Sequence, residues 1–504
     1  MTEPFWFTSS GAGLWVQTTD AMDVKINDRG DGLGQFAILD VNRFAGKVFI
    51  ERYADGVYAD YVGSVGKPAK SEPTYRDYRR PVWNTWAQFY LGTDQRKILD
   101  YAERLSGAHL PAHAVQIDGG WEEQRGDLTF DPQRFPDPKA MSRRIHQLGF
   151  AVGTWVSFYI TANSSNFEEA KRRGFLMRDG EDRSQPCIFP FVRSTAPGMA
   201  TGMLDLGNRE AKAWYTRKLR ALMEREGVDG LKIDYPNLPS KCAPASGHSR
   251  SDYRELEAAF ADQFDLQGLG IRLHWGMQRY GFAVRGADKS TDWKALQAAV
   301  TQGLAVSTVG YPFVETDMIG GSAGGVGIEG TRPPNKAVLV RWAQAASLMP
   351  LMNSSTVPVG DIINPSNGQS RRYDAETTAL YKSAVLRHER LAPFIWARVR
   401  EAVATGEPIM KPLFFAFPTE ARAYKANDEW LLGDAILAAP VLTDAAARDV
   451  YLPAGRWFDV TKHTVIRGPT MLKAYPAGLQ MTPTFVRLGI RKQTDQAMRG
   501  LTSR

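Results

Sequence analysis

The sequence predicts an α/β fold: a (β/α)8 TIM barrel with a short N-terminal β region and a C-terminal antiparallel β-sandwich. Between residues 76 and 395, apolar runs of strand length alternate with runs of helix length. Such alternation indicates a parallel sheet covered by helices. Eight strand–helix repeats can be assigned, the number that closes a TIM barrel. The alternative is an open doubly wound sheet, which we disfavour because no glycine-rich phosphate-binding turn follows an early strand.

Residues 1–75 are expected to form the N-terminal β region. Short runs at 23–26, 35–39 and 47–50 are bounded by Gly, Asp and Asn, as is typical of strands joined by turns. A stretch at 67–73 that begins and ends near prolines then connects this region to the barrel.

The barrel prediction, residues 76–395, assigns apolar runs to strands and runs with helical spacing to helices. The expected strands are 83–86, 113–118, 151–158, 229–234, 271–275, 283–285, 307–313 and 350–353. The expected helices are 94–105, 138–148, 209–226, 251–266, one that begins at Trp293, 336–348 and 376–391. The crossover after the third strand is long, with a Ser/Asn-rich and a Pro/Gly-rich stretch.

Residues 396–491 are expected to form the C-terminal β-sandwich. The expected strands in this part of the chain are 409–417, 430–432, 435–439 and 449–452. Turn sequences such as Pro453-Ala454-Gly455 separate them. Residues 492–504 are polar, and we expect a frayed tail.

Composition limits the classes of function. The chain has 504 residues, 43% hydrophobic and 23% charged, which is ordinary globular composition. The net charge is +7, but Lys and Arg are spread along the chain without a dense basic run, so we expect no nucleic-acid partner. No stretch approaches the roughly 18 apolar residues of a membrane span, so we expect no membrane partner.

The N-terminus and the two cysteines give expectations about the cellular compartment of the protein. The first residues lack the basic and apolar regions of a signal peptide, so we expect a cytoplasmic protein. Cys187 and Cys242 are too few for a disulfide scaffold or a zinc site. They permit one bridge without requiring it, and a reducing compartment fits them slightly better.

Two aspartates form the candidate catalytic pair. Asp234 ends the short apolar strand 229–234, and Asp288 follows the expected strand 283–285. TIM barrels carry their active sites at the carboxyl ends of the strands. Glycoside hydrolysis uses two carboxyl groups, about 5 to 5.5 Å apart in retaining enzymes. We therefore expect Asp234 to be the nucleophile and Asp288 the general acid and base, with Asp292 as the alternative acid.

The two aspartates need different protonation states. Asp234 must stay ionised, and Lys232, two residues away on the same strand face, would favour its anion. Asp288 must hold a proton near neutral pH, which we expect from burial or from the negative charge of Asp234.

Further side chains are candidates for substrate binding. We expect Asp118 to accept hydrogen bonds from sugar hydroxyls and Trp155 to form an apolar wall. Arg285 would pair with a carboxylate or reach a sugar hydroxyl, and Asp317 would do either. Each has a structural alternative, because buried Asp–Arg pairs often organise loops and Trp often packs in cores. For Lys232, binding and scaffolding are weighed equally.

No metal or cofactor is expected. His248 and His274 lack partners at metal-ligand spacing. Glycoside hydrolysis needs carboxyl groups and water alone.

Several segments resemble glycoside hydrolase family 31, a family of retaining α-glycosidases. The similar segments, in the family's order, are 116–118 with 130–138, 204–211, 231–234, Asp288 with Trp293, 311–321, 341–350, 412–415, 431–434 and 448–457. The resemblance covers about residues 80–490. It implies that Asp234 is the nucleophile and Asp288 the acid and base, and it suggests that Asp118 binds sugar hydroxyls.

Within this family, residues 80–87 and 304–321 look most similar to the branch of the myogenesis-regulating glycosidase and bacterial α-galactosidases. Two departures bear on the sugar. Many α-glucosidases of the family have Glu where this chain has Asn237, and a sugar-binding His in the stretch that corresponds to 352–355. Both departures argue against plain α-glucosidase specificity.

The resemblance therefore favours an exo-acting α-glycosidase, with an α-galactoside as the first expected substrate. The alternatives are an α-glucosidase, an α-xylosidase, a transglycosylase, or a catalytically silent glycan-binding protein on the same scaffold. The expected partner is the carbohydrate substrate. The N-terminal β region is shorter than is usual for the family, so another subunit of a homo-oligomer is one way to complete the pocket wall.

Overall fold

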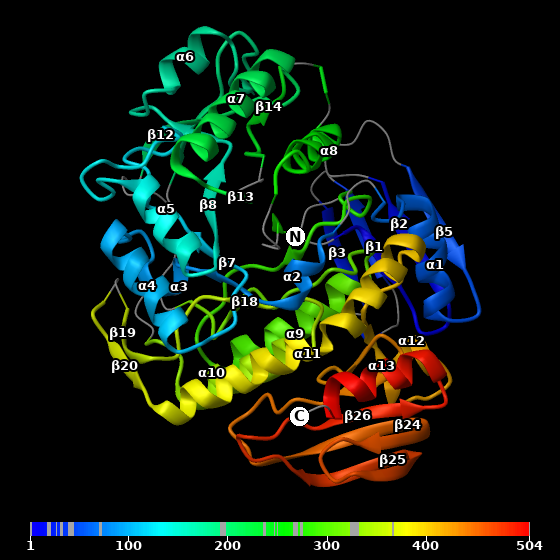
Figure 1. Cartoon of the computed structure of the whole chain (residues 1–504). Helices are drawn as coiled ribbons and strands as arrows, with labels where there is room; N and C mark the ends of the chain where they lie inside the picture. The colour runs from blue at the N-terminus through cyan, green and yellow to red at the C-terminus, as the bar shows by residue number, and fades with distance from the viewer. Residues whose placement is uncertain are drawn as a thin grey trace.

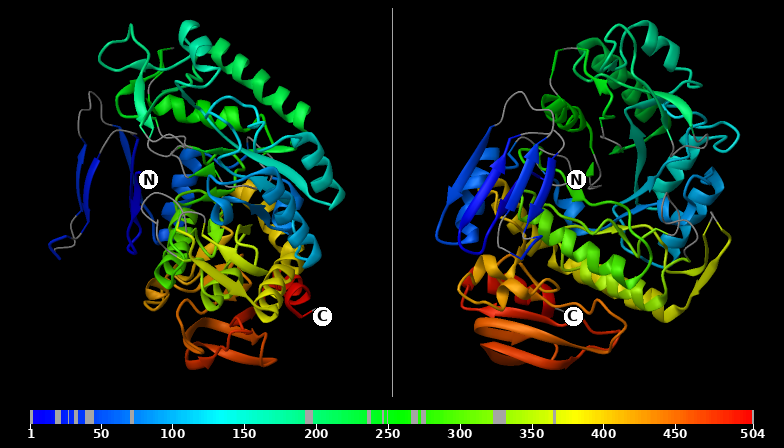
Figure 2. Two further views of the ribbon diagram at one scale, coloured as in Figure 1. Left: turned by 90° about the vertical axis from the view of Figure 1, so that its left-hand side faces the viewer. Right: turned by 180° about the vertical axis from the view of Figure 1, so that it is seen from behind.

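The computed structural model describes most of the chain and shows three parts in sequence order (Figure 1). The described residues are 3–17, 22–26, 28–30, 34–38, 45–69, 73–191, 198–234, 238–245, 247–248, 250–265, 271–272, 276–322, 332–364 and 367–502. The N-terminal strands lie beside the barrel, and the C-terminal sheet forms a separate layer at one end of the molecule (Figures 1 and 2).

The N-terminal region contains the expected strands and one helix that was not expected. The strands are β1 (Phe5–Phe7), β2 (Ala12–Val16), β3 (Met22–Ile26), β4 (Gly34–Ile38) and β5 (Gly46–Ile50). Helix α1 (Ala54–Val65) lies within the segment expected to be β, so that expectation was wrong for these residues. Its aromatic face explains the difference, because Tyr61 stacks on Phe5 with 3.8 Å between the ring centroids.

The central part is the predicted TIM barrel. The parallel strands run in the order β13-β8-β7-β6-β18-β17, and β15 pairs with β16. Their bounds are β6 (Val82–Asn84), β7 (Ala114–Ile117), β8 (Ala151–Ser157), β13 (Gly230–Asp234), β15 (Ile271–Arg272), β16 (Val284–Arg285), β17 (Met318–Ile319) and β18 (Asn353–Ser354). The register places Lys232 beside Trp155 and Arg272 beside Arg285.

Several helices of the barrel begin with a side-chain cap. Asp94, Asp137 and Asn208 each accept a hydrogen bond from a backbone N–H of the first turn, which satisfies a donor that the helix leaves unpaired. The helices are α2 (Tyr75–Arg79), α3 (Trp86–Phe89), α4 (Gln95–Gly107), α5 (Pro138–Gln147), α7 (Arg209–Glu226), α8 (Arg250–Ala261), α9 (Trp293–Ser307), α10 (Lys336–Ala346) and α11 (Ala375–Thr405). Trp86 therefore begins a short helix instead of ending the first strand.

The seventh strand does not lie where the sequence predicted it. Residues up to Ser307 belong to α9, and the chain turns at Gly310, whose φ is 91°. Val314 bridges Val284 of β16, and β17 follows at Met318. The periodicity of a short apolar run does not distinguish a buried helix from a buried strand. The sequence alone could therefore not place this strand.

The long crossover between β8 and α7 forms a small antiparallel sheet. Its elements are β9 (Tyr159–Thr161), α6 (Phe167–Arg172), β10 (Arg178–Asp179), β11 (Ile188–Phe191) and β12 (Met199–Met203). Strand β12 lies between β11 and β9, and β10 pairs with β14 (Cys242–Ala243). A disulfide joins Cys187 to Cys242. It ties the crossover to the segment that follows β13.

The C-terminal β-sandwich contains a sheet in the order β21-β22-β23-β26-β24-β25. Its elements are β21 (Met410–Pro412), α12 (Leu413–Ala416), the 3-10 helix η1 (Ala423–Lys425), β22 (Trp430–Leu432), β23 (Ile436–Ala438), β24 (Ala447–Asp459), β25 (Thr464–Pro476) and β26 (Thr484–Leu488). The strand expected at 409–417 therefore ends at Pro412, and a one-turn helix takes the place of its second half. The hairpin β19 (Gly360–Ile363) and β20 (Ser370–Tyr373) precedes α11.

The expected frayed tail is instead a helix, α13 (Arg491–Thr502). It packs against α11 through small residues, because Ala497 and Gly500 are buried and Gly500 lies against Leu391. The expectation of fraying was wrong because one narrow face of a polar helix is enough to hold it to a neighbour.

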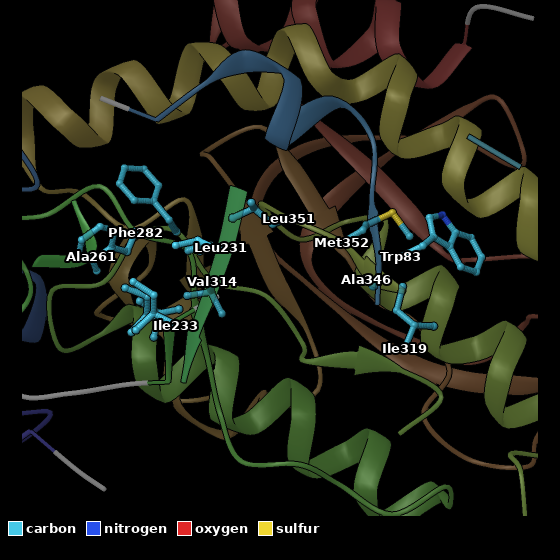
Figure 3. Close-up of a cluster of buried hydrophobic side chains, with 14 of the residues drawn as sticks. Trp83, Leu231, Ile233, Ala261, Phe282, Val314, Ile319, Ala346, Leu351 and Met352 are labelled. Atoms are coloured by element: carbon cyan, nitrogen blue, oxygen red, sulfur yellow. The ribbon is translucent and has the colours of Figure 1, made fainter. Parts of the chain in front are cut away.

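Buried aliphatic and aromatic side chains fill the barrel and continue outward to its helices. Figure 3 shows part of this core, with Leu231, Phe282, Ile319 and Leu351 from different elements. In the part of the chain that the structure describes, no helix is both long and apolar enough to cross a membrane.

Candidate active site

Asp234 lies at the end of β13, a strand that is buried along its whole length. Its carboxylate accepts hydrogen bonds from Arg272 Nε at 2.9 Å, Trp155 Nε1 at 3.1 Å and Arg285 Nη2 at 3.2 Å. Burial raises the pKa of Asp234, but the positive charges of Arg272, Arg285 and Lys232 outweigh burial and hold the pKa well below its ordinary value. Asp234 is thus an ionised carboxylate, as a nucleophile requires.

Asp288 contacts the same two arginines as Asp234. Its Oδ1 accepts from Arg272 Nη2 at 2.9 Å and from Arg285 Nη1 at 3.5 Å. Burial and the charge of Asp234 raise the pKa of Asp288, but the positive charges of Arg272 and Arg285 lower it by more. The pKa of Asp288 is therefore below its ordinary value. The expectation that Asp288 keeps a proton was therefore wrong for the site without a sugar.

Arg272 joins the two aspartates, and sequence reasoning missed it. Its Nε binds Asp234 and its Nη2 binds Asp288. The available signal was a basic residue inside the short apolar strand 271–275, but that signal says nothing about direction. Only the register of β15 and β16 shows that Arg272 and Arg285 lie side by side.

Arg285 is the most deeply buried charge of the site, with 1% of its side chain exposed. It contacts Asp234, Asp288 and also Asp317, whose Oδ1 lies 3.3 Å from Nη1. The backbone of Asp317 has a φ of 63°, a conformation that residues other than Gly rarely adopt. Two guanidinium groups therefore face three carboxylates, which lets the site hold buried charge.

Asp118 and Lys232 form a second buried ion pair. Lys232 Nζ lies 2.7 Å from Asp118 Oδ2, and both side chains are almost fully buried. The backbone N–H of Asp118 donates to Thr85 Oγ1 at 3.0 Å, and Gly119 N–H donates to Asp118 Oδ1 at 2.8 Å. These contacts fix the carboxylate beside the pocket. Lys232 binds Asp118 directly and acts on Asp234 through its charge.

Asp292, the alternative acid, lies away from this cluster. It caps α9, where its Oδ1 accepts from Ala295 N–H at 2.9 Å. A capping role accounts for this residue, so the geometry favours Asp288 as the acid.

The five residues Asp118, Trp155, Lys232, Asp234 and Asp288 line one cavity of about 310 Å³. Trp86, Gly119, Arg125 and Arg272 complete the lining. Arg285 contacts the lining residues Asp234 and Asp288, and Asp317 contacts Arg285. Asn237 and His274 lie outside the described residues. Among the described side chains, none gather as ligands of a metal ion would, and the absence of a cofactor stays a prediction.

Models of known protein families match most of the chain. A model described as the family 31 glycosyl hydrolase TIM-barrel domain matches residues 82–269 and 272–398, and one for the family's C-terminal domain matches 406–490. The chain belongs to glycoside hydrolase family 31. A third model, the N-terminal domain of the myogenesis-regulating glycosidase, matches residues 1–65.

Curated relatives include proteins with different substrates. The myogenesis-regulating glycosidase of Mus musculus is 31% identical over 435 residues, covering 83% of this chain and 57% of the relative. An α-xylosidase of Emericella nidulans is 26% identical over 499 residues, covering 90% of this chain and 58% of the relative. The chain spans a little over half the length of these relatives.

Solved structures confirm the fold. A dextranase of Flavobacterium johnsoniae complexed with glucose has a TM-score of 0.80 at 20% identity, over 96% of this chain and 60% of that chain. An α-xylosidase from a soil metagenome complexed with xylose has a TM-score of 0.78 at 21% identity, over 98% and 74%.

Proposed function

We propose that this protein is a retaining α-glycosidase that removes a terminal α-linked hexose, with an α-galactoside as the preferred substrate. The observation that carries the proposal is the pair Asp234 and Asp288 held by the single guanidinium of Arg272. One guanidinium keeps the carboxyl groups close together, as the retaining mechanism requires.

In the first step, an oxygen of Asp234 attacks the anomeric carbon while the bond to the leaving oxygen breaks. Asp288 gives its proton to that oxygen, so the aglycone departs as an alcohol. Because Asp288 is ionised in the site without sugar, it must take up a proton as the substrate binds. Sugar hydroxyls that accept hydrogen bonds from Arg272 would weaken its hold on Asp288 and raise the pKa of that carboxyl.

In the second step, the Asp288 carboxylate takes a proton from water, and the water oxygen displaces Asp234 from the anomeric carbon. The sugar leaves with its original configuration and Asp234 is again a carboxylate. The proton that Asp288 took from water returns to solvent when the sugar departs and Arg272 binds Asp288 again. Arg272 and Arg285 stabilise the carboxylate of Asp234 as it departs.

The identity of the sugar depends on individual hydrogen bonds to its hydroxyls. Asn237 and the residues 352–355 favour the α-galactoside over the α-glucoside, as argued from the sequence. Relatives named α-xylosidase and neutral α-glucosidase C make an α-xyloside and an α-glucoside the second candidates.

The test is release of nitrophenol from 4-nitrophenyl α-galactoside, α-glucoside and α-xyloside. We expect turnover of the galactoside, and we expect Asp234→Asn to lower kcat at least about 10³-fold because the nucleophile is lost. The matched control is Asp137→Asn, since Asn caps a helix as well as Asp does and Asp137 lies at the start of α5.

Each other outcome has a defined meaning. Turnover of the xyloside or the glucoside alone would correct the sugar and keep the mechanism. If Asp137→Asn and Asp234→Asn behaved alike, the assigned nucleophile would be wrong. Sugar binding without turnover of any substrate would establish the silent glycan-binding protein instead.

A further inference from the structure

A second cavity adjoins the candidate sugar pocket. It encompasses about 390 Å³ of space, part of which is open to solvent, and is lined by Leu91, Gly120, Glu122, Glu123, Gln124, Arg125, Trp155, Thr161, Asn163 and Met199. Arg125 and Trp155 line both cavities. The common wall is therefore the Trp155 ring, with the Arg125 guanidinium 4.5 Å from its centroid.

The second cavity lies on the flank of the sugar pocket that is away from Asp288. Its described lining comes from the segments after α3 and β7, from β8 and β9, and from β12. None of these described residues belongs to β13, β15 or the loop after β16, which carry Asp234, Arg272 and Asp288. The scissile oxygen must lie beside Asp288, so the aglycone leaves on the opposite flank. A group in the second cavity would be attached to the far end of the sugar.

The walls of this cavity suit a hydroxyl-rich ring. Glu123, Gln124 and Asn163 supply polar groups, while Leu91 and Met199 supply apolar surface. Polar residues outnumber apolar ones on this wall, which suits a ligand that carries many hydroxyl groups.

The wall carries opposite charges that favour a neutral ligand. Glu122 is buried and accepts hydrogen bonds from the N–H groups of Gly126 at 3.1 Å and Leu128 at 2.9 Å. Burial raises the pKa of Glu122 to about 7, and the positive charge of Arg125 acts against that rise. Glu122 and Glu123 lie on the same wall as Arg125, so the described lining carries both signs of charge.

The cavity is also preformed. The N–H and Oγ1 of Thr161 both donate to Arg125 O at 3.1 Å. Trp121 Nε1 donates to Trp155 O at 2.7 Å, and Asn166 Nδ2 donates to Gly126 O at 2.7 Å. Walls fixed in this way bind a ligand without a further ordering cost.

We propose that this cavity is a subsite for a second, neutral sugar ring, attached to the hexose at the end remote from the scissile bond. The protein then releases a disaccharide from an extended substrate as well as a single sugar from a short one. This proposal rests on the proposed glycosidase function.

The test compares 4-nitrophenyl α-glycosides of the preferred hexose with the same compounds carrying a second hexose at O4 or O6. We expect at least one extended compound to be cleaved at the aryl bond with a kcat/KM equal to or above that of the parent. Asn163 Nδ2 donates to Gln124 Oε1, so the two side chains form one polar pair on the wall. Asn163→Ala and Gln124→Ala should each lower the ratio of extended to parent kcat/KM about three- to tenfold, because each removes one member of the pair that offers the second sugar its hydrogen bonds. The matched control, Gln480→Ala at an exposed position of the C-terminal sandwich, should leave the ratio unchanged.

Rejection of every extended compound by a protein that cleaves the parent would overturn the subsite and keep the glycosidase. An unchanged ratio in both cavity variants would do the same. If no glycoside is cleaved, calorimetry with the free monosaccharide and disaccharides decides. Tighter disaccharide binding that Asn163→Ala weakens supports the subsite while the glycosidase proposal fails, and absence of that preference overturns the subsite.

Discussion

Glu315 is a buried carboxyl next to the candidate active site that the proposed chemistry leaves without a role. It is 3% exposed, and Asn353 Nδ2 donates to its Oε1 at 3.1 Å. Among the described residues, none hydrogen-bonds its other oxygen. Burial raises its pKa to about 7, with Asp317 adding to the rise and Arg285 and Lys232 opposing it. Glu315 therefore changes charge near neutral pH inside the barrel.

This raised pKa makes a prediction about stability and pH. In the unfolded chain Glu315 has its ordinary pKa of 4.5, whereas in the folded protein its pKa is about 7. Its contribution to stability is thus fully present below pH 4.5 and is lost as pH rises to about 7. We expect the Tm of Glu315→Gln minus that of the wild type to increase over this window in scanning calorimetry. A difference independent of pH would show that Glu315 titrates normally.

At the scale of elements, the disulfide fixes the segment that follows the nucleophile strand. The bridge from Cys187 to Cys242 closes a separation of 55 residues and holds β14 next to the crossover. Disulfides persist in oxidising compartments, and the cytoplasmic location expected from the sequence stays a prediction.

We predict that Cys187→Ser combined with Cys242→Ser destabilises the protein by about 2 to 4 kcal/mol, because the unfolded chain regains the entropy of the open loop. Chemical denaturation measures the loss. Dithiothreitol should lower the stability of the wild type and leave the double variant unaffected, and equal stability of both proteins without reductant would contradict the prediction.

Elements with clear periodicity were predictable, and those decided by packing were not. Helix α7 matches the expected 209–226 at both ends, and β13 ends at Asp234 as expected. Helix α13 was missed because its buried stripe consists of small residues, Ala497 and Gly500. Asp234 was predictable because a buried strand that ends in a carboxylate is costly without a partner, whereas Asp288 was assigned from the need for a second carboxyl group and from the family resemblance. Arg272 was missed because its direction depends on the register with β16.

At the scale of the whole molecule, Glu3 joins the N-terminal region to the barrel. Tyr311 Oη donates to Glu3 Oε1 at 2.5 Å, and Gly276 N–H donates to the same oxygen at 3.2 Å. Tyr311 and Gly276 belong to the barrel, so one buried carboxyl group bridges the two parts. The N-terminal strands are thereby held next to the segment that follows Arg272.

We predict that Glu3→Ala destabilises the protein by about 1 to 3 kcal/mol, because it leaves the buried Tyr311 hydroxyl without this partner. Limited proteolysis should then cleave the N-terminal strands faster than the rest of the chain. Equal cleavage rates in Glu3→Ala and the wild type would mean that aromatic packing between α1 and Phe5 suffices to hold the region.

Helix α11 extends over 31 residues, about 46 Å at the rise of an α-helix. It packs against α10 of the barrel and also against α13, which follows the last strand of the C-terminal sandwich. In Figure 1 it runs between the barrel and the C-terminal sheet. Pro393 lies inside this helix and removes one of its backbone hydrogen bonds, but the contacts of the helix with both parts couple them. The barrel and the sandwich should therefore melt as a single cooperative unit.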